Sequence, residues 1–131
     1  MLRGDTAVDK VMDSIYDAAT GLLDETRNYY GIGPATAVTS YHYDDIGRLR
    51  RTVDPEGNEL RKYFDPSNNV QIVREERLEH DSVDSQNDYT VTVFYDYDLY
   101  GNVYRKTVDE DGDGVKDATD PSTYFYYDAL D

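Results

Sequence analysis

The 131-residue sequence contains no cysteine and no tryptophan, and it is poor in the side chains that build hydrophobic cores. The absence of cysteine excludes disulfides and thiolate metal sites. Leu, Ile, Val and Phe together number 27, close to the fraction at which disorder begins. No apolar run approaches the length of a membrane span, so we predict no membrane insertion.

Basic residues are also scarce, with 13 Lys and Arg against 28 Asp and Glu and a formal net charge of −15. Nucleic acids and anionic membranes require a basic surface, so neither is an expected partner. The acidic composition fits a soluble, metal-tolerant, extracellular protein. The first ten residues, MLRGDTAVDK, contain no apolar segment typical of a signal peptide. If the protein is exported, we expect this chain to be a fragment whose signal lies upstream.

Tyrosine, by contrast, is abundant at 14 residues, and an aromatic residue followed by Asp recurs along the chain. The Asp-to-Asp spacings are 27, 21, 33 and 30 residues, a range typical of structural repeats. Each Asp is expected to accept N–H groups in a turn, while each ring lies on the sheet face in a ladder. An aromatic platform for carbohydrate is the alternative. The pairs are Tyr16-Asp17, Tyr43-Asp44, Phe64-Asp65, Tyr97-Asp98 and Tyr127-Asp128.

The shortest spacing shows the predicted unit most plainly. Asp44 to Gly47 and Asp54 to Gly57 both have Asp first and Gly fourth, a type I turn pattern. Residues 48–53 and 58–64 are of strand length and alternate in character. One unit is therefore two antiparallel strands and two tight turns.

The longer spacings are interpreted as the same unit with insertions at loop tips, where extra residues cost little stability. We place insertions at residues 31–36, 80–88 and 109–120. The flanking strands are predicted at residues 70–78, 89–97, 103–108 and 123–127. The turn after Tyr97 carries Gly101 at its fourth position, as Gly47 does after Tyr43.

The segments YHYDDIGRLRRTVDPEGNELRKYFD, YDYDLYGNVYRKT, YDAATGLL and YYDALD resemble the YD repeats of RHS-type proteins, which include bacterial RHS proteins, toxin-complex shells and teneurins. The resemblance extends from about residue 15 to the end. It implies a spiral β-sheet with a structural or encapsulating role. The chain has about five copies, fewer than a closed shell needs, and it has no recognisable cleavage or toxin segment.

The segment DEDGDGVKDATD has the spacing of an EF-hand calcium loop, in which alternate carboxylates and one carbonyl surround a Ca²⁺ ion. Gly114 stands at position 6, where the loop must turn sharply. The six predicted ligands, at positions 1, 3, 5, 7, 9 and 12, are Asp109, Asp111, Asp113, Val115 through its carbonyl, Asp117 and Asp120.

Two features separate this loop from an EF-hand. Its last ligand is Asp rather than Glu, and its flanks are predicted strands rather than helices. The segment therefore looks more like the calcium loops of thrombospondin type 3 repeats and dockerins, and it indicates a structural calcium. Mg²⁺ fits this large all-protein cage less well. A solvated acidic turn without metal is the alternative.

No catalytic constellation emerges, so we do not expect an enzyme. The two histidines, His42 and His80, lie in different repeats. His80, Asp81 and Ser82 are contiguous, whereas catalytic triads are assembled across a fold. A hydrolase using a carboxylate pair stays an alternative, because 28 acidic residues supply many accidental pairs.

The sequence as a whole predicts an all-β antiparallel meander of about ten short strands, forming part of a spiral sheet or open barrel. Residues 1–14 are assigned to an N-terminal tail or the remnant of a preceding repeat, and residues 15–131 to the repeat domain. The expected function is a structural segment of a larger exported bacterial protein, outside the cell or on its surface. Expected partners are neighbouring repeats or further copies of itself. The alternatives are a self-assembling filament and a carbohydrate- or surface-binding module.

Overall fold

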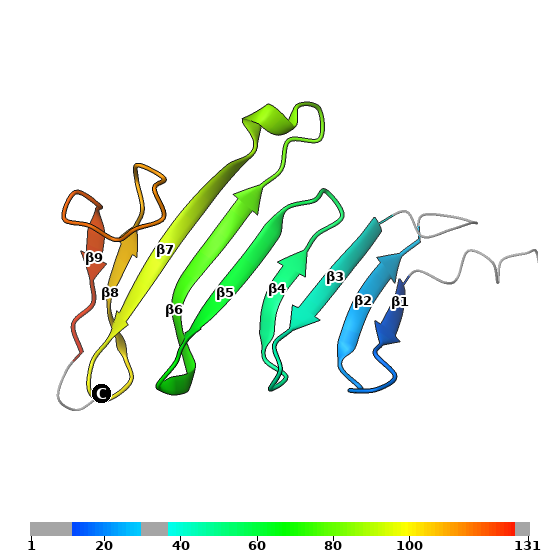
Figure 1. The fold of residues 1–131 in the computed structure, drawn as a ribbon, viewed down its shortest axis with the longest axis horizontal. Helices are drawn as coiled ribbons and strands as arrows, with labels where there is room; N and C mark the ends of the chain where they lie inside the picture. The colour runs from blue at the N-terminus through cyan, green and yellow to red at the C-terminus, as the bar shows by residue number, and fades with distance from the viewer. Residues whose placement is uncertain (1–11, 30–36, 128–131) are drawn as a thin grey trace, which may run out of the picture. The chain divides into compact units, whose positions relative to one another are not determined.

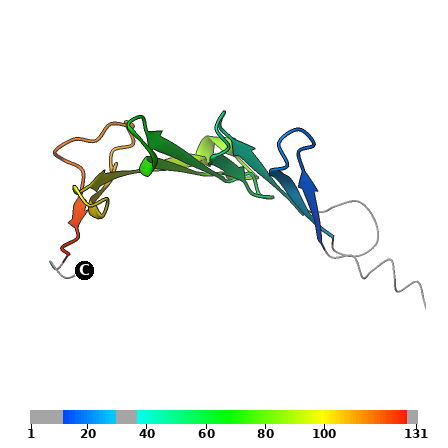
Figure 2. The ribbon, with the colours of Figure 1, turned by 90° about the horizontal axis from the view of Figure 1, so that it is seen from below.

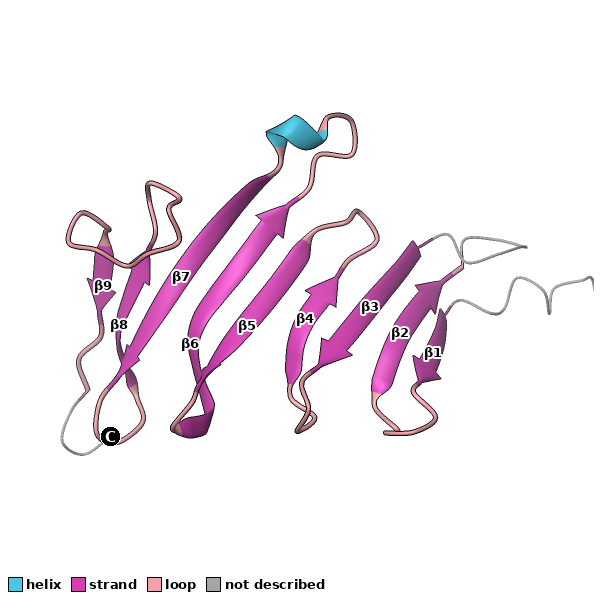
Figure 3. Cartoon of the chain, viewed as in Figure 1, coloured by secondary structure: helices cyan, strands magenta, loops and turns pink. Residues whose placement is uncertain are grey.

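The computed structural model describes residues 12–29 and 37–127, and these form an all-β antiparallel structure (Figures 1 and 3). The predicted fold class is confirmed. The chain divides into two units, residues 1–58 and residues 59–131. In each unit the strands lie in the order of the sequence and the last strand does not pair with the first, so neither sheet is closed.

The first unit contains β1 (Met12–Tyr16), β2 (Leu23–Asn28), β3 (Ala37–Tyr43) and β4 (Leu49–Val53). β2 pairs antiparallel with both β1 and β3, and β3 pairs antiparallel with β4. β1 begins inside the segment assigned to the tail. The predicted insertion at residues 31–36 lies outside the described residues.

The second unit contains β5 (Glu59–Asp65), β6 (Asn68–Glu79), β7 (Tyr89–Tyr97), β8 (Val103–Val108) and β9 (Ser122–Tyr124). Each of these strands pairs antiparallel with the next. A short 3₁₀ helix, η1 (Ser85–Asn87), lies in the predicted insertion between β6 and β7. No described helix is long and apolar enough to cross a membrane.

The strand predictions differ from the structure mainly at the ends. β7 and β8 have the predicted bounds, whereas β6 is longer and β9 ends at Tyr124 rather than at residue 127. β6 begins early because Asp65 pairs with Asn68 across a two-residue turn. Directly after β9 the Phe125 N–H still donates to the Tyr104 carbonyl at 2.9 Å, and beyond it the chain leaves the ladder. The hydroxyl of Tyr127, rather than its backbone, bonds to β8, at 2.8 Å from the Val103 carbonyl.

A repeated turn joins the strands at Asp44, Asp54 and Asp98. In each turn one carboxylate oxygen accepts the backbone N–H groups of the second and fourth residues after the Asp, at 2.8–3.1 Å. The N–H of the Gly three residues on donates to the carbonyl of the Asp at 3.0–3.1 Å. The turns predicted from Asp at the first position and Gly at the fourth are therefore confirmed.

The strand pairing is also irregular at the same point of each repeat. The strand register shifts immediately before the aromatic residue of all four described aromatic-Asp pairs, at Tyr16, Tyr43, Phe64 and Tyr97. Such β-bulges increase the local twist and change the direction of a strand. The aromatic-Asp pair thus fixes a bulge and a turn together.

Packing in both units follows from the shortage of aliphatic residues. Among the described residues no hydrophobic side chain is buried, and the buried ones are Thr92, Thr107, Asp109 and Asp120. Figure 2 shows the strands of each unit edge-on, with no second described layer on them. Half-buried cross-strand contacts take the place of a core. Tyr63, for example, lies 3.9 Å below the Arg74 guanidinium and donates its hydroxyl to Glu76 at 2.8 Å.

Gly101 tests the turn geometry. Its φ of +85° is unfavourable for a residue with a Cβ atom, but an added Cβ would meet only the Gln71 amide at 3.8 Å. We therefore expect Gly101→Ala to lower the free energy of unfolding by about 1 kcal/mol through backbone strain alone. Urea unfolding measures the change. Gly101→Asn should lose less stability, because Asn tolerates positive φ values better than Ala does. An unchanged midpoint for the alanine variant would contradict the turn assignment.

Tyr95 makes the stability of the folded chain vary with pH in the alkaline range. Burial, reinforced by a hydrogen bond with Glu75, raises the pKa of Tyr95 to about 12. Between pH 10 and 12 the folded chain keeps a proton that the unfolded chain has lost. Its contribution to stability is complete below pH 10 and declines as pH rises towards 12. Urea unfolding at about pH 9 and 11 should show a smaller decline for Tyr95→Phe than for the parent. Tyr126→Phe is the control at a 91% exposed position, and its stability should decline with pH as that of the parent does.

Candidate metal centre

The acidic segment 109–120 is the connection between β8 and β9 and contains all but one residue of that hairpin loop. Two backbone hydrogen bonds close its base. The Val108 N–H donates to the Pro121 carbonyl at 3.1 Å, and the Asp109 N–H donates to the Thr92 carbonyl at 2.9 Å. The loop is thus held by the end of β8 and also by β7.

Five of the six predicted ligands lie together in this loop. Asp109, Asp111 and Asp120 each offer a carboxylate oxygen, and these three atoms lie within 4.8 Å of one another. Asp111, Asp113 and Asp117 form a second such group. Because Asp111 belongs to both, the predicted carboxylates are contiguous. The Val115 carbonyl, the sixth ligand, stays a prediction.

Asp109 organises the first half of the loop. Its two carboxylate oxygens accept the N–H groups of Gly112 and Gly114, each at 2.7 Å. These glycines have φ values of +77° and +79°, so both turn the chain in the left-handed region. Sequence reasoning identified the need for Gly114 but not the same need at Gly112.

Asp120 closes the second half of the loop in a similar way. Its carboxylate accepts the Glu110 N–H at 3.1 Å and the Asp117 N–H at 3.0 Å. Asp109 and Asp120 are only 7% and 8% exposed, whereas Asp111, Asp113 and Asp117 are exposed. The first and last predicted ligands therefore form the inner wall of the cluster, and the other three face solvent.

The electrostatics of the loop differ from residue to residue. Burial alone would raise the pKa of Asp109, but the N–H groups of Gly114 and Gly112 outweigh it and the pKa is lowered. The Asp113 N–H alone would lower the pKa of Asp111, but burial and the charges of Asp113 and Asp109 outweigh it and the pKa is raised. Because the neighbouring carboxylates repel its negative charge, a cation bound at Asp111 would offset that repulsion.

Lys116, the one basic residue of the loop, is turned away from this cluster and onto the sheet. Its ammonium lies 2.8 and 2.9 Å from the two carboxylate oxygens of Asp96 on β7. Asp96 also accepts Arg105 Nε from β8 at 2.7 Å. Sequence reasoning missed this anchor. The only signals were a lone Lys in an acidic run and an acid between Tyr95 and Tyr97.

The donor set fits a hard cation. All the converging groups are carboxylate oxygens, which suit Ca²⁺, Mg²⁺ or Mn²⁺ rather than softer metals. Each oxygen that accepts one N–H has a further lone pair for an ion. If a calcium ion is held here, Asp109, Asp111, Asp113, Asp117 and Asp120 would hold it, and it would offset their mutual repulsion.

Two tyrosines of the repeat predicted to be structural, Tyr97 and Tyr127, make equivalent bonds. Tyr97 donates its hydroxyl to the Ile72 carbonyl at 2.7 Å, and Tyr127 donates to the Val103 carbonyl at 2.8 Å. In both cases the acceptor lies on the preceding strand, beyond the last ladder pair. Each hydroxyl thus adds a bond between the two strands beyond the end of their ladder. Phe64 has no hydroxyl and makes no such bond, and Asp128 lies outside the described residues.

The turns at Asp17 and Asp65 are variants of the repeated turn. The Asp17 carboxylate accepts the N–H groups of Ala19 and Thr20 at 2.9 and 2.7 Å, and Gly21 follows one residue later than in the other turns. Asp65 accepts the Ser67 and Asn68 N–H groups at 2.6 and 3.2 Å. Every described Asp of an aromatic-Asp pair therefore accepts N–H groups in its own turn.

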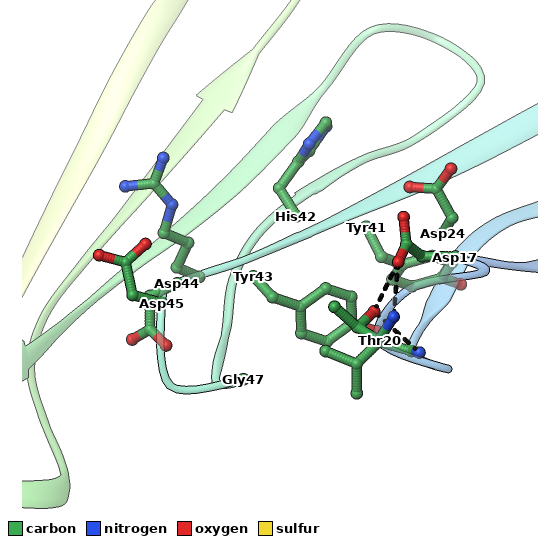
Figure 4. A pocket seen from close by; sticks show the side chains of 11 residues that line it. Asp17, Thr20, Asp24, Tyr41, His42, Tyr43, Asp44, Asp45 and Gly47 are labelled. Carbon is green, nitrogen blue, oxygen red and sulfur yellow. Dashed lines mark hydrogen bonds between the residues drawn. The ribbon is translucent and has the colours of Figure 1, made fainter.

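A concavity of about 360 Å³ lies within the first unit, between the turns that begin at Asp17 and Asp44 (Figure 4). Tyr41, His42 and Tyr43 of β3 line it. Figure 4 shows Asp17 directed at Thr20, which makes hydrogen bonds to it through both its N–H and its hydroxyl. The Asp17 and Asp44 carboxylates are thus already engaged in their turns, and the concavity is the space between two neighbouring repeat turns.

The second histidine, His80, has a structural environment. Its Nδ1 lies 3.1 Å from each carboxylate oxygen of Asp88, and the Asp81 N–H donates to the same carboxylate at 2.8 Å. Asp81 in turn accepts the N–H groups of Val83 and Asp84. These contacts fold the insertion between β6 and β7.

No protein-family model and no curated protein sequence matches this chain. The resemblance to YD repeats therefore depends on the residues of the sequence alone.

Proposed function

We propose that this chain is a non-catalytic structural segment of a YD-repeat protein of the RHS type, acting outside the cell or on its surface. The supporting observation is the repeated coupling of a bulge to a turn. All four described aromatic-Asp pairs have the register shift before the aromatic residue, and the Asp of each accepts N–H groups in the turn that follows. Such a unit builds an extended sheet by repetition, because each hairpin needs contact only with its neighbours.

We propose further that Ca²⁺ stabilises the loop at residues 109–120. The two groups of carboxylates that share Asp111 support this proposal, and so does the need to offset their charge. A bound ion would compact a twelve-residue connection and fix the β8–β9 hairpin. The partners in this role are neighbouring repeats of the same kind or further copies of the chain.

Amide hydrogen exchange with calcium and with EDTA tests both parts separately. We expect the turn amides of Tyr100 and Asn102 to be protected in both conditions, since Asp98 accepts them. The amides of Gly112 and Gly114 should exchange about 10-fold or more slowly in calcium, since an ion would hold their acceptor in place. Unprotected turn amides would contradict the repeat structure. Loop amides unaffected by calcium would contradict only the metal proposal.

A further inference from the structure

The outer edge of β9 is free among the residues that the structure describes, because β9 pairs only with β8 and ends the strand order of the second unit. The Phe125 N–H donates to the Tyr104 carbonyl, and the Pro121 carbonyl accepts the Val108 N–H. Backbone groups alternate in direction along a strand, so those of Ser122 and Tyr124 point away from β8. The edge therefore presents two N–H groups and two carbonyls.

The segment that forms this edge has an unusual composition for this chain. Residues 122–127 read STYFYY and contain no charged residue, although 31% of the chain is charged. Tyr124, Phe125, Tyr126 and Tyr127 are 52%, 41%, 91% and 48% exposed. Natural edge strands are commonly protected from pairing by a charged side chain, a proline or a bulge. β9 has none of these, and its short length is its one protection.

We propose that the β9 edge pairs with β9 of a second copy of this chain, antiparallel and about a two-fold axis at Thr123. In this register Ser122 lies opposite Tyr124 of the second copy and Tyr124 lies opposite its Ser122. Each outward N–H then meets an outward carbonyl, which gives four hydrogen bonds. This inference depends on the proposed role of the chain in strand pairing with copies of itself, and it specifies the edge, the register and the symmetry.

Self-complementarity and charge favour a second copy as the partner. The outward groups of β9 match themselves about a two-fold axis in the antiparallel register, and that register places Thr123 beside Thr123, a favourable cross-strand pair. The chain carries a net charge of −15, so two copies repel unless their acidic loops are kept apart. The acidic segment 109–120 ends one residue before β9. Antiparallel pairing therefore places each loop beside the uncharged aromatic end of the other copy's strand.

A single introduced cysteine tests the register, because the chain has none of its own. In the proposed dimer Thr123 and its two-fold mate form a non-hydrogen-bonded pair with Cα atoms about 4.5 Å apart, within disulfide reach. Thr123→Cys should therefore cross-link to a dimer rapidly with diamide. Ser122→Cys is the matched control, since its two copies lie diagonally at about 7–8 Å and should react at least about 10-fold more slowly. Equal rates for the two variants would overturn the two-fold register.

A proline substitution tests the edge itself. Tyr124→Pro removes an outward N–H and leaves the bonds to β8 in place, as proline does on natural edge strands. Tyr124→Ala, which removes the ring and keeps the N–H, is the control. In sedimentation experiments the parent should associate as concentration rises, the alanine variant should still dimerise, and the proline variant should stay monomeric. A parent that is monomeric at every concentration, or a proline variant that still associates, would overturn the pairing. Association without selective cross-linking at residue 123 would leave the proposed function standing and overturn this dimer.

Discussion

Replacing Asp111 and Asp113 together by alanine is expected to lower the affinity for Ca²⁺ by about 100-fold or more. Asp111 is the residue shared by both carboxylate groups, so its loss breaks the continuity of the site. The Asp113 N–H alone would lower its pKa, but burial and the charges of Asp113 and Asp109 outweigh it, so a cation at this position would offset their repulsion. Calorimetric titration measures the affinity, and the melting temperature should rise with calcium for the parent and not for the double variant.

The control for this experiment is Glu110→Gln. Glu110 lies in the same loop at position 2, which is not a ligand position, and its N–H contact to Asp120 is a backbone contact that the substitution keeps. We expect its affinity to fall by no more than a few-fold, through the loss of one charge. Binding by the double variant that equals binding by the parent would contradict the metal site. If Glu110→Gln lowered the affinity for Ca²⁺ as much as the double substitution does, the binding would reflect general charge attraction instead.

The second large effect is expected at Asp96, where the acidic loop is attached to the sheet. Asp96→Asn would leave the Arg105 guanidinium and the Lys116 ammonium close together without their shared carboxylate. The free energy of unfolding should fall by about 1.5–3 kcal/mol, the range for hydrogen bonds to charged groups. Urea unfolding at neutral pH measures this fall. Asp45→Asn, at an exposed acid of the first unit, carries the same charge change and should be nearly neutral.

Asp96 should also account for part of the loss of stability at acidic pH. Burial alone would raise the pKa of Asp96, but the hydrogen bonds and charges of Arg105 and Lys116 outweigh it, and the pKa lies below its usual value of 3.8. A lowered folded-state pKa contributes stability that is present above pH 3.8 and is lost as pH falls through the lower folded value. Asp96→Asn should therefore lose less stability on acidification than the parent. A parallel loss in both chains would contradict the Asp96 contacts.

The sequence predicted the turns better than it predicted the packing. Asp at the first position and Gly at the fourth have a local cause, so the turns at Asp44, Asp54 and Asp98 could be located from the residues alone. The end of β7 and the start of β8 followed from the turn at Asp98. The bulge before each aromatic residue could not be predicted, because it depends on the register between two strands rather than on one of them.

The candidate site was also predicted only in part. The spacing of the acidic residues was enough to group five carboxylates, because a short loop with glycines has few ways to fold. The anchor between Lys116 and Asp96 was not predictable, since it joins residues 20 positions apart on different elements. The hydroxyl bonds of Tyr97 and Tyr127 were missed for the same reason, although an aromatic residue at a fixed repeat position was a signal for them.

The central claim is that the aromatic-Asp unit is a repeat that adds to a sheet, and duplication of one unit tests it most directly. Tyr127 precedes Asp128 as Tyr97 precedes Asp98, so a second copy of residues 98–127 can be joined directly after Tyr127 with the Tyr-Asp pair preserved. We predict that the lengthened chain folds with added sheet, binds two Ca²⁺ ions instead of one and melts at a higher temperature. An added unit whose amides exchange as in an unfolded peptide, with stability unchanged or lowered, would contradict the claim.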